Sequence, residues 1–216
     1  MFVQNQMSKN PVTVSPDTGL DVAQNLMKKH KFRRLPVIDD EGALVGFFSD
    51  RDLMRVAPSP ATTLSKYEIT ELLADIKVKD IMQKNVFTVS EDATIEEAAL
   101  QMVLHKIGGL PVVSQVGTVV GIITETDIFR TFVNVMGLAD GRTRITVRVE
   151  NKHGIVRDLS AIFADHGWNI DSLVTAKQPD ASYEIVIRTD AEDEDAIKKA
   201  LTDKGFDVIH TTKISK

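Results

Sequence analysis

The chain has 216 residues, of which 43% are hydrophobic and 26% charged, and its formal net charge is −5. This composition is typical of a globular protein and excludes a disordered or fibrous one. Cysteine is absent, which excludes disulfides, thiolate nucleophiles and cysteine metal sites. A protein that binds a nucleic-acid polymer usually carries an excess of basic residues. This chain has more acidic than basic residues, so no such partner is expected.

The residues also carry no targeting or membrane signal. The first of them have neither the basic region nor the apolar core of a signal peptide. The longest apolar stretches, 44–48 and 116–123, fall far short of the roughly 20 residues that span a bilayer. We therefore expect a cytoplasmic protein with no membrane partner.

The N-terminal part of the chain is an internal repeat. Shifting the sequence by 75 residues aligns 7–55 with 82–130 without a gap. Identical pairs include Thr13/Thr88, Met27/Met102, His30/His105, Pro36/Pro111, Gly46/Gly121 and Asp52/Asp127. Because chance does not give so long an ungapped register, the first 135 or so residues are two copies of one unit.

Each copy is predicted to fold in the order β-α-β-β-α. In the first copy, a short strand at 12–14 precedes a helix whose apolar residues are spaced as on one buried face. Strands at 35–38 and 44–48 follow, and a second helix begins near residue 49. The second copy repeats this order from a strand at 87–89. One such unit is marginal alone, so we expect the copies to pack as one module around one core.

The segment between the copies is not part of the repeat. Two prolines predict a loop at 57–61, because proline breaks both helices and sheets. Ser65 and Glu68 have the spacing of a capping box and predict the start of a connecting helix that ends near Ile76.

The most informative residues end the last strand of each copy. In the first copy Ser49 is followed by Asp52, and in the second Thr124 is followed by Asp127. A hydroxyl and a carboxylate at this spacing form a capping box, which would explain both residues. The same helix N-terminus offers N–H groups to an anion, and its carboxylate can accept hydrogen bonds from a ribose. The spacing alone leaves capping and ligand binding open.

With the Leu-Pro-Val strands and a glycine in the preceding strand, these paired motifs resemble a tandem pair of CBS domains. The resemblance implies a disc-shaped module with two clefts for adenosine-containing ligands such as AMP, ADP, ATP, S-adenosylmethionine or a cyclic dinucleotide. It implies that each aspartate holds the ribose and that the Ser or Thr lies beside the phosphate. The nucleotide-binding residues expected from it are Val12, Thr13, Arg33, Arg34, Pro36, Gly46, Ser49, Asp52, Phe87, Thr88, Pro111, Gly121, Thr124 and Asp127.

Three of the aligned positions at which the copies differ bear on a phosphate. The pairs are Arg33/Gly108, Arg34/Gly109 and Arg51/Thr126. Arginine suits phosphate because its donors fork, so the first copy offers more guanidinium while the second offers access past its glycines. The arginines are equally well explained as solvated surface residues.

The remaining residues change to the order β-α-β-β-α-β, which is ferredoxin-like. Alternating apolar residues predict the first strand at 145–149, and a turn at 151–154 leads into an amphipathic helix. Later elements are predicted as a hairpin of 169–175 and 183–187, a helix at 191–204 and a strand at 206–209.

The strand, the V-E-N-x-x-G-I-V turn and the helix resemble an ACT domain over about residues 143–212. The resemblance implies pairing through sheets or helices, and an amino-acid site near Asn151, His153 and Gly154. Alternatively, Gly154 only permits a tight turn that Asn151 caps.

Two CBS domains followed by an ACT domain resemble the acetoin-utilisation protein AcuB family over essentially the whole chain. The predicted fold class is α+β. The predicted domains are CBS repeat 1 at 1–58, a linker and connecting helix at 59–76, CBS repeat 2 at 77–136 and the ACT domain at 142–216. The family implies regulation in acetoin or acetyl-CoA metabolism through a partner enzyme, although no residue here recognises acetoin.

The sequence carries no G-x-S-x-G, P-loop or H-E-x-x-H motif, and its five histidines are scattered. We therefore expect no enzyme activity, no catalytic residue, no metal and no resident cofactor. The expected protein is a homodimeric regulator that senses an adenosine nucleotide through the CBS pair and relays its occupancy through the ACT domain. An amino-acid sensor and a structural adaptor with degenerate clefts remain alternatives.

Overall fold

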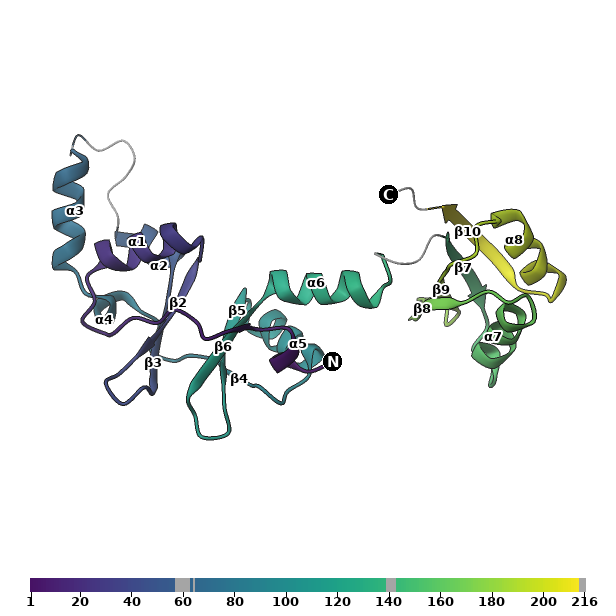
Figure 1. Ribbon diagram of the computed structural model, residues 1–216, viewed down its shortest axis with the longest axis horizontal. Coiled ribbons are helices and arrows are strands. Elements are labelled where there is room, and N and C mark those ends of the chain that lie inside the picture. The colour runs from purple at the N-terminus through teal and green to yellow at the C-terminus, as the bar shows by residue number, and fades with distance from the viewer. Residues whose placement is uncertain (57–62, 64, 139–142, 214–216) are drawn as a thin grey trace. The chain divides into compact units, whose positions relative to one another are not determined.

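The structure is a computed structural model that describes residues 1–56, 63, 65–138 and 143–213. It divides into two compact units, Met1–Ile128 and Phe129–Lys216 (Figure 1). Both mix helices with open sheets, so the predicted α+β class is confirmed. The loop predicted at 57–61 lies outside the described residues. Among the helices described, none is long and apolar enough to cross a membrane.

The first copy of the repeat forms a helix, a hairpin and a second helix. The elements are α1 (Leu20–His30), β2 (Arg34–Ile38), β3 (Leu44–Ser49) and α2 (Asp50–Val56). The predicted buried face of α1 is confirmed, because its buried residues are Leu20, Ala23 and Met27. The strands β2 and β3 pair antiparallel.

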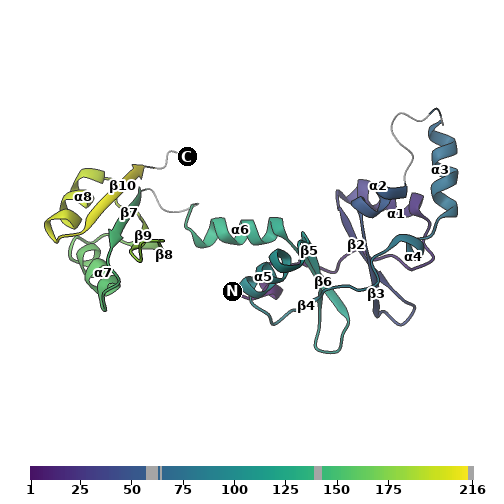
Figure 2. The same cartoon turned by 180° about the vertical axis from the view of Figure 1, so that it is seen from behind.

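The second copy has the same order, which can be followed from behind in Figure 2. The elements are β4 (Val89–Ser90), α5 (Ile95–His105), β5 (Gly109–Val113), β6 (Val119–Thr124) and α6 (Glu125–Val135). The repeat predicted from the 75-residue register is therefore present in the fold as well as in the sequence.

The strands predicted at 12–14 and 87–89 are mostly absent. In the first segment only Val14 pairs, through hydrogen bonds with the backbones of Pro36 and Ile38. In the second segment the strand β4 begins only at Val89. The β-branched and aromatic residues there favour extended backbone, but a strand also needs neighbours for its N–H and C=O groups, and these segments meet β2 and β5 only at their ends.

The connecting helix α3 spans Lys66–Asp75 and begins with the predicted capping box. The Ser65 side chain accepts a hydrogen bond from the Glu68 N–H, and the Glu68 carboxylate accepts one from the Ser65 N–H at 2.8 Å. Leu73 buries the helix against the first copy, since its side chain is 3% exposed.

The first residues of each copy, 3–9 and 78–83, pack against the other copy and are called the exchanged segments. The turn η1 (Val3–Asn5) and strand β1 (Ser8–Lys9) begin the first copy, but β1 pairs with β6 of the second. The helix α4 (Val78–Ile81) begins the second copy, but Val78 is buried in the core of the first. Val3 and Val78 are themselves aligned by the 75-residue shift, so the two copies exchange equivalent segments.

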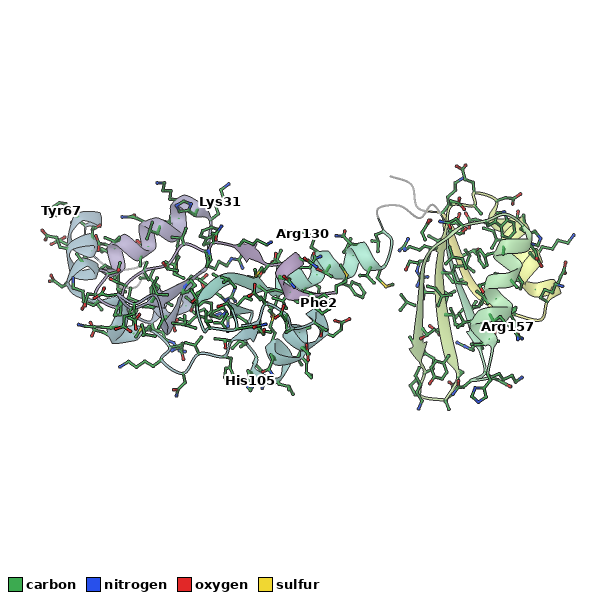
Figure 3. The ribbon with its side chains drawn as sticks, turned by 60° about the horizontal axis from the view of Figure 1, so that its bottom comes forward. Phe2, Lys31, Tyr67, His105, Arg130 and Arg157 are labelled. Carbon is green, nitrogen blue, oxygen red and sulfur yellow. The ribbon has the colours of Figure 1, made fainter. Side chains whose placement is uncertain are left out.

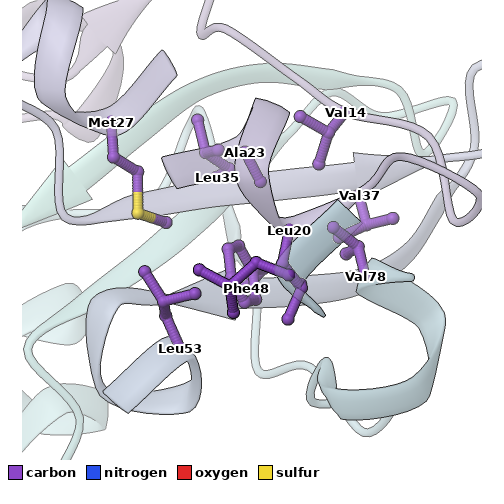
Figure 4. Close-up of a cluster of buried hydrophobic side chains, with 10 residues drawn as sticks. Val14, Leu20, Ala23, Met27, Leu35, Val37, Phe48, Leu53 and Val78 are labelled. Atoms are coloured by element: carbon purple, nitrogen blue, oxygen red, sulfur yellow. The ribbon is translucent and has the colours of Figure 1, made fainter. Parts of the chain in front are cut away.

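This exchange replaces the single shared core that the sequence predicted with two hydrophobic clusters. The first contains Val14, Leu20, Ala23, Met27, Leu35, Val37, Phe48, Leu53, Leu73 and Val78 (Figure 4). The second contains Val3, Val89, Ile95, Ala98, Met102, Leu110, Val112 and Ile123. Each cluster is completed by one valine from the exchanged segment of the other copy, and in this way two marginal units stabilise one another.

The second unit contains the predicted β-α-β-β-α-β order, now preceded by the end of α6. Its elements are β7 (Thr143–Val149), α7 (Ile155–Asp165), β8 (Ile170–Lys177), β9 (Tyr183–Thr189), α8 (Glu194–Asp203) and β10 (Asp207–Lys213). The sheet order is β10-β7-β9-β8, with every pair antiparallel. Buried residues of α7 and α8 share one cluster with alternate residues of β7 and β9, so both helices cover the same face of the sheet (Figure 1).

Two local expectations for this unit are corrected. The last strand runs to Lys213 rather than ending at Ile209, because β10 pairs with β7 as far as Thr143. Asn151 does not cap α7, whose N-cap is Gly154 with φ +85° and no side-chain cap. The glycine is needed for that left-handed backbone.

Candidate ligand-binding sites

The motif of the first copy is a buried carboxylate held by a hydroxyl. Ser49 ends β3, and its Oγ donates a hydrogen bond to Asp52 Oδ2 at 2.6 Å. The Ser49 N–H donates to the same oxygen at 2.9 Å. Asp52 is only 4% exposed. The capping role is therefore realised, and it occupies one of the two carboxylate oxygens.

The motif of the second copy repeats this geometry almost atom for atom. Thr124 Oγ1 and its N–H donate to Asp127 Oδ2 at 2.7 and 2.9 Å. Asp127 is 7% exposed. The chain thus holds two equivalent carboxylates, each buried at the start of a helix.

The other oxygen of Asp52 faces the segment that belongs to the second copy. Asp52 Oδ1 accepts a hydrogen bond from Gln83 Nε2 at 3.4 Å and lies 3.7 Å from Arg55 Nη1. Gln83 is held there because its backbone exchanges two 2.9 Å hydrogen bonds with Phe47 of β3. The exchanged segment therefore forms one wall of the first motif.

The motif glycines mark a close approach, and the neighbour is again the exchanged segment. Both Gly46 and Gly121 are buried within their strands. A Cβ on Gly46 would collide with the sulfur of Met82, and one on Gly121 would collide with the sulfur of Met7. A glycine is therefore needed at both positions because a methionine side chain lies against the strand there. The 75-residue register already aligns the two methionines with one another.

The arginine–glycine difference between the copies is a direct contact between them. Arg34 lies opposite Ser49 in the hairpin and is half-buried, whereas Arg33 is exposed. A Cβ on Gly108 would collide with the guanidinium of Arg34 and with Glu125. Burial lowers the pKa of Arg34, and the charge of Glu125 opposes that shift. Arg34 therefore fills the space beside Gly108 where the sequence predicted free access.

The other expected nucleotide-binding residues line the same hairpins. Pro36 and Pro111 are buried in β2 and β5. Val12 and Thr13 are partly buried just before the bridge at Val14. In the second copy Phe87 and Thr88 are exposed just before β4, and the Phe87 ring stacks on His105, labelled in Figure 3, at 3.6 Å.

The second unit has a cavity beside the predicted amino-acid loop. Its volume is about 500 Å³, within the usual range of small-molecule pockets. Glu150, Lys152 and Ile155 line it from the loop and the start of α7, and Lys204 lines it from the turn after α8. The predicted residues Asn151, His153 and Gly154 alternate with these in sequence but are not among the lining residues. The cavity carries both signs of charge, as an amino acid would require.

A smaller cavity of about 280 Å³ lies between α1 and α2 of the first copy. Its lining is mostly apolar and includes Met27, Phe32, Leu53 and Met54. Met54 is 72% exposed, so the cavity opens on an apolar helical surface.

Comparison with protein-family models identifies the families to which the two parts of the chain belong. The family model for the CBS domain matches residues 3–59 and 78–134, and the model for the ACT domain matches residues 143–206. The two CBS matches begin at Val3 and Val78, the valines of the exchanged segments.

Solved structures similar to this chain are CBS pairs. The CBS domain pair of protein MJ0100, in complex with 5′-methylthioadenosine and S-adenosyl-L-methionine, is 30% identical with a TM-score of 0.51, covering 61% of this chain and 99% of that one. CBSX2 in complex with AMP is 30% identical with a TM-score of 0.52, covering 62% and 97%. A putative acetoin utilisation protein (AcuB) from Vibrio cholerae is also 30% identical, with a TM-score of 0.52, covering 64% and 94%.

Proposed function

The chain belongs to the CBS-domain family and carries a C-terminal ACT domain, and we propose that it is a non-catalytic sensor of adenosine-containing ligands. The observation that carries the proposal is the pair of equivalent buried carboxylates, Asp52 and Asp127, each beside a hydroxyl at a helix start. The proposed ligands are AMP, ADP, ATP or S-adenosylmethionine, since similar CBS pairs bind AMP and S-adenosylmethionine.

The chemistry of the motif suits a ribose and a phosphate. A carboxylate accepts hydrogen bonds from both vicinal hydroxyls of a ribose, and such charge-assisted bonds are stronger than neutral ones. In the first copy Oδ1 of Asp52 would make these bonds, because Oδ2 accepts two hydrogen bonds from Ser49 whereas Oδ1 accepts one long bond, from Gln83. The hydroxyl and the nearby N–H groups would then lie beside the phosphate.

Calorimetric titration of the full chain with the four candidate ligands tests the proposal. At least one is expected to bind saturably, and Asp127→Ala is expected to remove binding at one cleft. A matched control is Glu97→Ala, since Glu97 caps α5 through Thr94 with the same geometry but lies outside the motif. No binding by any ligand, or equal binding by the two variants, would favour a structural adaptor with degenerate clefts.

The ACT domain is proposed as the element that relays occupancy. The helix α6 begins directly after Thr124 and contains Asp127, and the carbonyl of its last residue, Val135, accepts a hydrogen bond from Ser172 of β8 at 3.0 Å. A ligand that acts on the start of α6 can therefore bias a helix whose end contacts the ACT sheet.

We further propose that the chain is a homodimer through its CBS and ACT domains and regulates a partner enzyme in acetoin or acetyl-CoA metabolism, by similarity to AcuB. A cytoplasmic location fits the absence of cysteine.

The second candidate function is amino-acid sensing by the ACT domain. It is supported by the cavity of about 500 Å³ beside the loop 151–154. Titration of the twenty amino acids, followed by amide chemical shifts, tests it. Shifts at Asn151, His153, Gly154 and Lys204 are expected if an amino acid binds there, and an unchanged spectrum would exclude this function.

A further inference from the structure

One face of the ACT sheet is not covered by α7 and α8, and that face carries charged residues. Ile145 and Val147 of β7 are fully buried beneath the helices. Side chains alternate between the faces of a strand, so Arg144, Thr146 and Arg148 lie on the opposite face. The register of the sheet arranges this face in rows that run across the strands.

The row that contains Arg148 places its guanidinium between two carboxylates. Arg148 lies opposite Glu184 on one side and Asp207 on the other. Its Nη2 is 3.6 Å from Glu184 Oε1. This row needs no further partner.

The row at the other end of β7 carries positive charge only. Arg144 lies directly opposite Arg188 of β9, and the residues flanking the pair are Ser172 and Thr212. Like charges opposite one another in a sheet are destabilising. Arg144 donates to Thr146 Oγ1 at 2.8 Å, and its Nη1 lies 3.5 Å from His210 Nδ1. The row therefore holds two guanidinium groups and no carboxylate.

Arg188 is the more unusual of the two arginines. It is 5% exposed, and its Nε and Nη1 are buried without a hydrogen-bond partner among the residues that the structure describes. Burial lowers its pKa, and the charge of Arg144 adds to the shift. Buried donors without acceptors are costly and rare, and in native proteins they call for an explanation.

The turn after α6 covers Arg188. Gly137 has φ +65°, and a Cβ there would lie 3.3 Å from Arg188 Cδ and 3.1 Å from Ser172 Cβ. The hydrogen bond from Ser172 to Val135 holds the same turn on the sheet. The turn packs against the arginine, but its described residues, up to Leu138, supply no acceptor to Nε or Nη1.

From these observations we propose that Arg144 and Arg188 form a binding site for an oxyanion, a carboxylate or phosphate group, on the face of the ACT sheet opposite α7 and α8. Two forked donors side by side match the oxygens of such a group, and the flanking hydroxyls of Ser172 and Thr212 can add hydrogen bonds. The site is separate from the cavity near the loop 151–154, which includes Arg148 at the opposite end of β7. It does not depend on the proposed nucleotide function.

Arginine Nε–H signals of the ¹⁵N-labelled full chain test this proposal directly. Inorganic phosphate and acetate are titrated separately against chloride at constant ionic strength, which distinguishes a phosphate from a carboxylate. A saturable shift of the Arg188 Nε–H signal with either anion is expected. Absence of a saturable shift with both would overturn the proposal.

Three variants make the result specific to the row. Arg188→Gln and Arg144→Gln are each expected to lower the affinity for the anion at least tenfold. Arg148→Gln removes the same charge from the same face and is expected to leave the affinity unchanged. Equal affinity in Arg144→Gln and wild type would contradict the proposal even if Arg188→Gln fails to fold. A response seen only as protein concentration rises would place a second chain's carboxylate there, and would also overturn it.

Discussion

Replacing Arg188 by methionine is expected to make the ACT domain more stable in chloride buffer. Methionine keeps an unbranched apolar stem but removes the charge and the two buried donors that lack acceptors. An unsatisfied buried donor costs about 1–3 kcal/mol. Taking the lower end for each of the two donors gives an expected gain of about 2 kcal/mol in the free energy of unfolding.

The single tryptophan makes this gain measurable in the full chain. Trp168 packs against the ACT cluster, with its ring edge-on to Phe163 at 5.9 Å. Its fluorescence during urea unfolding therefore reports the ACT domain, even though a chain of several domains does not unfold in one step. Arg148→Met is the matched control, because this partly exposed arginine should change stability by less than about 1 kcal/mol.

The same measurement in phosphate or acetate separates the cause from a general packing effect. An anion at about 100 times its dissociation constant stabilises the protein that binds it by about 2.7 kcal/mol. Wild type should gain this amount while Arg188→Met gains none. The difference between their free energies of unfolding should therefore shrink or change sign. If Arg188→Met is less stable than wild type in chloride, Arg188 is already satisfied and the reasoning fails.

Three further predictions concern the CBS pair. Gly46→Ala should destabilise the first copy by about 1–3 kcal/mol, because the new alanine Cβ would collide with the Met82 sulfur. Unfolding followed by circular dichroism should show this loss, and adding Met82→Ala should recover part of it. Hydrogen bonds from Thr94 lower the pKa of Glu97, so this capping bond stabilises above the unfolded pKa near 4.5 and is lost as pH falls through the lower folded value. In an NMR titration, Thr94→Ala should therefore raise the pKa of Glu97, and an unchanged pKa would contradict the capping assignment. 2′-Deoxy-AMP should bind at least tenfold more weakly than AMP in calorimetry, and equal affinity would exclude a ribose-binding carboxylate.

Much of the fold follows from the sequence because the decisive signals are local. The capping box at Ser65 and the apolar spacing of α1 involve residues within a few positions of one another. Because the copies align with a shift of 75 residues, the elements predicted for the first copy could also be predicted for the second. The same register aligned Asp52 with Asp127, whose surroundings are equivalent in the structure.

The exchange of segments between the copies could not be predicted from the same signals. Apolar residues at Val3 and Val78 indicate burial, but hydrophobicity does not say which of two equivalent cores receives a side chain. Consequently Met7, Met82 and Gln83 were missed as neighbours of the motifs.

Arg188 was missed for a different reason. Its place on β9, between the buried Ile187 and Thr189, marks an outward-facing position, where an arginine is normally solvated. The turn at Gly137, which is distant in sequence, packs against this side chain and contributes to its burial. A tertiary contact of this kind leaves no periodic trace in the sequence.

The contact between α6 and the ACT sheet leads to a last prediction, that the nucleotide and the oxyanion influence one another. Asp127 lies in the first turn of α6, and the turn after the helix covers Arg188. If AMP changes the position of α6, it must change the affinity for the anion, and by linkage the anion must change the affinity for AMP by the same factor.

Phosphate could also compete with AMP inside the CBS cleft, so AMP affinity is measured with and without phosphate in wild type and in Arg188→Gln. The variant keeps any direct competition and loses the ACT site, so the difference between the two responses is the coupling. Coupling free energies are typically about 1–3 kcal/mol, or roughly 5- to 150-fold in affinity. Identical phosphate responses in the two proteins would mean that α6 carries no signal, and the relay would then be wrong even if both sites bind their ligands.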